Sequence, residues 1–151
     1  MELQLIFTVL VFTTVGIALW FGRYPERSTA IALLVAAALT PLAQTSFFSE
    51  PEYGILAVDV MLLFWLANIA FTSDRFWPMF ATGFHLIGIL IHVARIAEAD
   101  IPPAVYGFSQ IFWSYPVLIS LLVGTLVEAR RAKLLQAHEV RDQTKSSRDP
   151  S

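Results

Sequence analysis

The sequence contains no cysteine, which excludes disulfide bonds, thiolate metal sites and cysteine nucleophiles. Charge is also scarce, since only 15% of the 151 residues are Asp, Glu, Lys or Arg and the formal net charge is -2. Proteins that bind nucleic acid need a concentrated basic surface to neutralise phosphates, so this class of partner is not expected. The signatures of several enzyme classes are missing as well: the sequence has no glycine-rich phosphate loop, no nucleophile elbow and no His-Glu-x-x-His motif.

Apolar residues, by contrast, make up 56% of the chain. Between Leu3 and Val127 the charged residues are confined to a few short clusters, whereas the last two dozen residues hold six of the ten basic side chains. This pattern is typical of membrane spans joined by polar connectors and followed by a cytoplasmic tail. A helix needs about 20 apolar residues to cross the hydrocarbon core of a bilayer. Five segments meet this requirement: residues 3–22, 28–47, 55–72, 77–97 and 104–127.

We therefore predict an all-α integral membrane bundle of five transmembrane helices. Because the connectors are short, sequential helices should be antiparallel neighbours. Residues 1–128 are expected to form the transmembrane domain, and residues 129–151 a cytoplasmic helical extension that becomes disordered beyond Asp142. The first segment is interpreted as a retained span, since it lacks the basic start and the small-residue cleavage site of a signal peptide.

The basic residues also predict an orientation. If the N-terminus lies outside, nine of the ten Lys and Arg residues fall on the cytoplasmic side and only Arg95 falls on the other. Basic residues favour cytoplasmic loops, so we predict an N-terminus outside and a C-terminus in the cytoplasm. The lack of a recognisable targeting signal indicates a bacterial inner (cytoplasmic) membrane.

The third and fourth segments carry side chains that a bilayer tolerates poorly. Counted from Arg75 in their connector, Asp59 lies 16 positions back and His92 lies 17 positions forward, so the two side chains should reach a similar depth. Arg95 follows about one helical turn beyond His92. A carboxylate in hydrocarbon is costly unless it is paired. We therefore predict a buried polar cluster of Asp59, His92 and Arg95, in which Asp59 contacts one of the other two.

Four further polar positions are candidates for the same region. His85 is seven positions before His92 and should share its helix face, whereas Asn68 should lie on the opposite side of its helix from Asp59. This arrangement suggests that the third helix is central in the bundle. Gln110 and Trp113 belong to a second polar face, on the fifth helix.

No metal site or cofactor is predicted. His85 and His92 are about 10.5 Å apart along the helix axis, which is too far to hold one ion or both faces of one haem. A site on the outer side formed by His92, Glu98 and Asp100 with Glu50 or Glu52 is chemically sensible. However, acidic residues in outer loops are also what membrane topology alone produces.

Three functions remain open. The leading hypothesis is a non-enzymatic accessory or scaffold subunit whose partners are the lipid bilayer and another membrane protein or a second copy. The second is a small proton-linked transporter or sensor that uses Asp59 and His92, because histidine titrates near pH ~6.5. The third is a membrane redox or metal-binding protein that uses His85, His92, Glu98 and Asp100.

Overall fold

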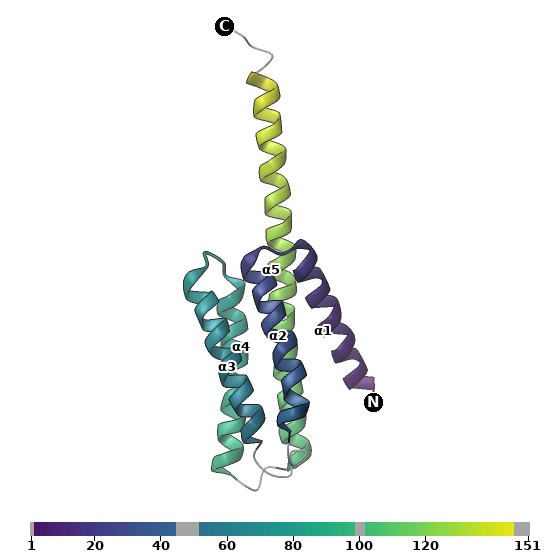
Figure 1. Cartoon of the computed structure of the whole chain (residues 1–151), viewed down its shortest axis with the longest axis vertical. Coiled ribbons are helices and arrows are strands. Elements are labelled where there is room, and N and C mark those ends of the chain that lie inside the picture. Colours follow the sequence, from purple (N-terminus) through teal and green to yellow (C-terminus); the bar gives the residue numbers. More distant parts are fainter. Residues whose placement is uncertain (1, 45–51, 99–101, 147–151) are drawn as a thin grey trace.

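The computed structural model describes residues 2–44, 52–98 and 102–146. These residues form five helices and no strand, so the all-α prediction is confirmed (Figure 1). The helices are α1 (Glu2–Phe21), α2 (Tyr24–Ala43), α3 (Tyr53–Thr72), α4 (Trp77–Ala97) and α5 (Pro103–Ser146). Four of them, α2 to α5, are long and apolar enough to cross a membrane. In α1 the part whose side chains are described, Leu5–Phe21, is a shorter apolar helix.

The five helices form a closed bundle in which the direction alternates along the chain (Figure 1). Each helix packs against its neighbours in sequence, α1 also packs against α5, and α5 touches α2 as well. Among the described residues α3 packs only on α2 and α4, so the expectation of a central third helix is wrong. Two helices have three neighbours each: α5 packs on α1, α2 and α4, and α2 packs on α1, α3 and α5.

Three helix boundaries differ from the sequence prediction. One is the end of α2, which lies at Ala43 rather than near residue 47; residues 45–47 lie outside the described part. Helix α2 begins at Tyr24 rather than near residue 28, because Pro25 suits the first turn and the Glu26 carboxylate accepts a hydrogen bond from the main-chain N–H of Arg23 at 2.9 Å. Helix α5 continues to Ser146, so the expectation of disorder beyond Asp142 is wrong for residues 143–146. Extending an existing helix adds one hydrogen bond for each residue fixed, and these four residues include no helix breaker. Residues 147–151 lie outside the described part.

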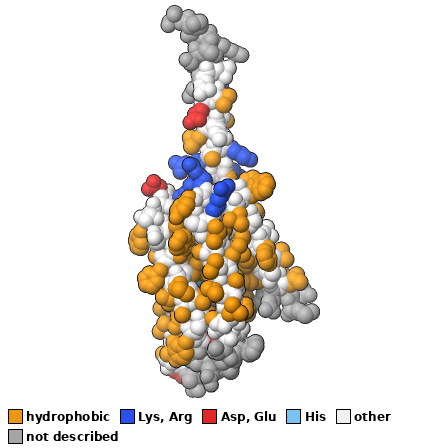
Figure 2. Space-filling model, in the orientation of Figure 1, with side chains coloured by type: hydrophobic (Ala, Val, Ile, Leu, Met, Phe, Trp, Pro, Cys, Tyr) orange, Lys and Arg blue, Asp and Glu red, His pale blue; other side chains and the backbone are white. Residues whose placement is uncertain are grey.

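The bundle has a small apolar core and an apolar exterior. Leu66 and Leu121 are fully buried, while Phe71 is 90% and Phe64 is 71% exposed. On the face drawn in Figure 2, hydrophobic side chains cover the bundle, and basic side chains gather where α5 leaves it. An exterior of large apolar residues suits contact with lipid, because lipid tails are as apolar as the side chains themselves. The polar interior contacts are concentrated in two clusters, one near each end of the bundle.

Candidate functional site

The first cluster is centred on His92 of α4, whose side chain is 1% exposed. The Nε2 atom of His92 lies 3.1 Å from Oδ2 of Asp59 on α3, and the hydroxyl group of Tyr106 on α5 is hydrogen-bonded to Nδ1. The predicted contact between Asp59 and His92 is therefore present. A neutral imidazole satisfies both contacts if Nε2 donates to the carboxylate and Nδ1 accepts from the tyrosine. Three helices thus meet at one ring.

The second histidine of α4 approaches Asp59 from another direction. The Nε2 atom of His85 lies 2.9 Å from the main-chain carbonyl oxygen of Asp59. A carbonyl oxygen only accepts hydrogen bonds, so the proton of a neutral His85 is assigned to Nε2. The two histidines share one face of α4, as their seven-residue spacing predicts. One binds the side chain of Asp59 and the other binds its main chain.

A small cavity of about 20 Å³ lies beside Asp59 and His85. Its wall includes Gln110 and Trp113 of α5, which are therefore brought to the cluster as well. The side-chain amide of Gln110 donates a hydrogen bond to the carbonyl oxygen of Gly88 at 3.2 Å. The space is about enough for a single water molecule, which needs roughly 10–15 Å³. We call Asp59, His85, His92, Tyr106 and Gln110 the Asp59 cluster.

Two of the predicted residues have other surroundings. Arg95 is 5% exposed, and its guanidinium carbon lies 6.0 Å from the centre of the Tyr106 ring, within reach of a cation–π contact. It therefore joins the Asp59 cluster through the tyrosine. Asn68 does not join it: its side chain is exposed on the outer surface of α3.

The described residues offer no metal centre. In this part of the chain no three His, Asp or Glu side chains lie close enough together to hold an ion. Of the outer-side ligands considered from the sequence, Glu98 is exposed and Glu52 is buried, whereas Glu50 and Asp100 lie outside the described residues. The metal site considered from the sequence therefore lies partly outside the described residues, and the metal and redox hypothesis stays a prediction.

The second cluster, at the opposite end of the bundle, is absent from the predicted sites. Glu26 of α2 is fully buried, and its Oε1 accepts hydrogen bonds from Nη1 of Arg75 at 2.7 Å and from the indole N–H of Trp77 at 3.0 Å. Arg75 also lies 3.2 Å from Oε2 of Glu128 on α5. Together with the main-chain N–H of Arg23, these groups satisfy both oxygens of Glu26. We call Glu26, Arg75, Trp77 and Glu128 the Glu26 cluster.

A close backbone approach completes the Glu26 cluster. The ring of Trp77 lies directly against Gly124, where an added Cβ would be 2.2 Å from Cγ of the indole. Only glycine leaves room for this ring, which packs on α5 while its N–H reaches Glu26 on α2. The sequence held one signal of this arrangement. Glu26 stands three positions after Arg23 and next to Pro25, which is the spacing of a helix N-terminal capping box.

The geometry suits helix fixation, and in the Asp59 cluster it also places the imidazole of His92 against a carboxylate and that of His85 against the main-chain carbonyl of the same residue. Within the described ranges the hydrogen bonds of His85 and His92 join them to Asp59 and Tyr106, so neither ring is paired with a serine or threonine hydroxyl as a base is with its nucleophile. Comparison with known proteins adds no constraint: no protein-family model matches the chain, and neither the curated proteins nor the solved structures give a match.

Proposed function

We propose that this protein is a non-enzymatic accessory or scaffold subunit of a membrane, which associates through α3 with another membrane protein or with a second copy of itself. The observation that carries the proposal is the position of Asn68. Its side chain is exposed on a helix long and apolar enough to span the bilayer. Within the Asp59 cluster and within the Glu26 cluster, in contrast, the polar groups form hydrogen bonds with other members of the same cluster inside the bundle.

An amide facing hydrocarbon is unfavourable because nothing there can hydrogen-bond to it. Asn68 shares its face with Phe64 and Phe71, at the i-4 and i+3 positions, and both rings are largely exposed. Asparagine side chains in membrane helices form hydrogen bonds to neighbouring helices, each contributing about 0.6–2 kcal/mol. A partner helix on this face would provide that bond, and the two aromatic rings would provide packing area around it.

Crosslinking tests this association directly, because the chain has no cysteine of its own. Phe64→Cys places a single thiol one turn from Asn68, and Val9→Cys places a matched thiol at an exposed position of α1. For self-association, oxidation in native membranes should give a disulfide-linked dimer of the Phe64→Cys variant but not of the Val9→Cys variant. Adding Asn68→Leu should reduce the dimer several-fold.

For association with a different protein, gentle detergent extraction should give a complex of defined mass that Asn68→Leu dissociates. The Val9 position serves again as the control, since Val9→Leu changes an exposed residue on another helix. A wild-type chain that is monomeric in mild detergent, with no co-purifying protein and no crosslink in membranes, contradicts the proposal.

The orientation and compartment belong to the same proposal: an inner membrane, with the N-terminus outside and the C-terminus in the cytoplasm. Support comes from the basic side chains that gather at one end of the bundle (Figure 2). Arg75 lies at that end in the α3–α4 connector, in contact with Glu128 of α5. Basic residues favour the cytoplasmic side. In intact cells an impermeant thiol reagent should label Glu98→Cys and not Asp74→Cys, both exposed positions; the reverse labelling contradicts the orientation.

A second candidate, a proton-linked transporter or sensor, is favoured by one specific observation. Tyr106, His92 and Asp59 form a continuous run of hydrogen-bonded groups. His85, which lines the small cavity beside Asp59, binds the main-chain carbonyl of the same residue. Such a run can pass a proton between neighbouring groups. Proton flux into liposomes should then be lost in Asp59→Asn and kept in Asp74→Asn, an exposed acid outside the bundle core. An absence of flux in the wild type removes this candidate.

A further inference from the structure

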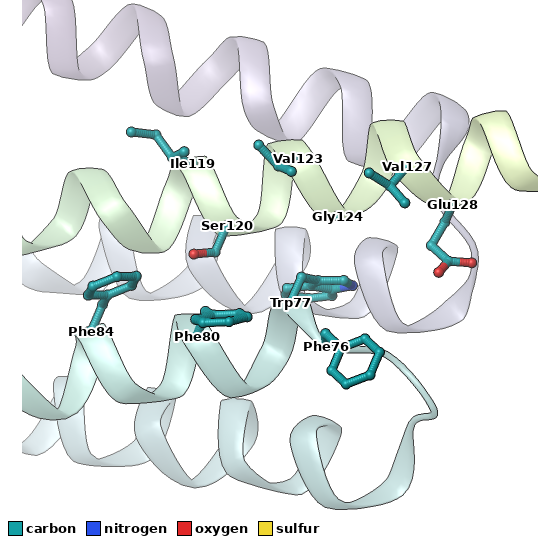
Figure 3. A pocket seen from close by; sticks show the side chains of 10 residues that line it. All are labelled: Phe76, Trp77, Phe80, Phe84, Ile119, Ser120, Val123, Gly124, Val127 and Glu128. Atoms are coloured by element: carbon teal, nitrogen blue, oxygen red, sulfur yellow. The ribbon is translucent and has the colours of Figure 1, made fainter.

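An outward-facing groove runs between α4 and α5 near the Glu26 cluster, with a volume of about 340 Å³ (Figure 3). One wall is a row of phenylalanines spaced four residues apart, which begins at the residue just before α4 and continues on that helix. The other wall is a row of aliphatic side chains with the same spacing on α5. These residues are Phe76, Phe80 and Phe84, and Ile119, Val123 and Val127.

The groove is open toward the surroundings and closed at its base. Phe80 is 61% and Val123 is 52% exposed, so both rims face outward. At the base Trp77 is 6% exposed, and its ring fills the space beside Gly124. Both helices are long enough to span a membrane, and an apolar groove on their outer surface is therefore accessible to acyl chains.

The length of the groove suits a single acyl chain. Phe76 and Phe84 are eight positions apart, which corresponds to about 12 Å along the helix axis. One leaflet contributes about half of the roughly 30 Å hydrocarbon core. The groove therefore covers most of the depth of one leaflet, starting from the end of the bundle that carries the basic residues.

The mouth of the groove offers cations suitable for a phosphate group. Arg130 and Arg131 follow Val127 by three and four positions, so they continue the same face of α5 one turn beyond the apolar rim. Both are exposed, and neither forms an ion pair with any residue in the described ranges. Glu128 is also at the mouth, where its carboxylate lies 3.2 Å from Arg75, a cation that it shares with Glu26. The three arginines Arg75, Arg130 and Arg131 outnumber these two carboxylates, so the mouth keeps a net positive charge. Arginine pairs well with phosphate oxygens because its N–H groups form a planar fork.

We propose that this groove binds one acyl chain of an anionic phospholipid from the adjoining leaflet, with the headgroup phosphate held by Arg130 and Arg131. The apolar length and the outward opening suit the acyl chain of a phospholipid. The exposed cations one turn beyond the rim lie where its headgroup phosphate would be. The proposal does not depend on the association through Asn68, which lies on α3, a helix that contributes no residue to the groove.

Native mass spectrometry of the full chain, titrated with phosphatidylglycerol or phosphatidylcholine carrying the same acyl chains, tests the proposal. The wild type should retain one phosphatidylglycerol molecule with at least about tenfold preference, since each basic residue near a membrane surface favours anionic lipid by about 1 kcal/mol. The double variant Arg130→Gln with Arg131→Gln should lose this preference. Lys133→Gln with Arg141→Gln removes the same charge from other exposed positions and should keep it.

The groove itself is tested by filling it after folding. Val123→Cys folds with a small side chain, and alkylation with a benzyl maleimide then occupies the groove; Val105→Cys, exposed elsewhere on α5, is the matched control. Alkylation should abolish lipid retention only at position 123. Three results overturn the proposal: equal retention of both lipids by the wild type, unchanged retention after alkylation at position 123, or a dimer that alkylation dissociates, which would assign the groove to a second copy.

Discussion

Replacing Glu26 with alanine should destabilise the bundle more than any change on its surface. The Glu26 carboxylate is fully buried and accepts hydrogen bonds from Arg75, Trp77 and the main chain of Arg23. Removing one partner of a buried ion pair costs about 3–5 kcal/mol, because the other charge stays buried without compensation. Arg75 is 14% exposed and keeps Glu128 at 3.2 Å, so part of this cost is recovered. We expect a loss of about 2–4 kcal/mol in the free energy of unfolding.

Unfolding in mixed micelles, with the helix content followed while sodium dodecyl sulfate is increased, measures this loss. Glu26→Gln keeps one acceptor oxygen and the side-chain volume, so it should cost only about 1–2 kcal/mol. Glu139→Ala is the control, since Glu139 is exposed on the α5 extension. If Glu26→Ala unfolds within 0.5 kcal/mol of the control, a threshold of about the size expected for surface substitutions, the reasoning about the Glu26 cluster is wrong.

The same titration checks two further substitutions. Gly124→Ala should cost about 1–3 kcal/mol, because the new Cβ would lie 2.2 Å from the Trp77 ring, whereas Gly83→Ala has nothing within 4 Å and should be neutral or stabilising. Tyr106→Phe removes the hydroxyl group hydrogen-bonded to a buried imidazole and should cost about 1–2 kcal/mol; Tyr53→Phe, at a 63% exposed position, should cost almost nothing. Equal effects at either matched pair would contradict the packing described above.

The Asp59 cluster could be located from the sequence because a short connector fixes the relative depth of two antiparallel helices. Asp59 and His92 are almost equally distant from Arg75, and a carboxylate in an apolar span requires a partner at its own depth. Tyr106 could not be selected in the same way. It lies near the start of α5, where a tyrosine is typical of a membrane border and needs no partner inside the bundle. Its place in the cluster depends on the packing of the whole bundle.

The Glu26 cluster and the exposure of Asn68 were missed for a related reason. Glu26 stands among charged residues near a predicted border of the membrane, where a solvated carboxylate is the ordinary expectation. Its burial results from Trp77 and Arg75, which are about 50 positions away in the chain and approach only when α4 packs on α5. Asn68 was expected to face a helix neighbour, but within the described ranges α3 has only α2 and α4 beside it. Helical periodicity gives the angle between two side chains but not which side faces a neighbour.

Each cluster contains a residue of α5, and the spacing of these two residues can be compared with the thickness of a membrane. Tyr106 and Glu128 are 22 positions apart on this continuous helix, which corresponds to about 33 Å, close to the thickness of the hydrocarbon core. The hydrogen bonds that join different helices are therefore concentrated near the two borders. Between them the described contacts are mainly apolar, such as the stacked rings of Phe84 and Trp113 with centres 6.5 Å apart. Because lipid competes equally well for apolar surface, the polar clusters at the borders are what select this arrangement of helices over others with similar packing.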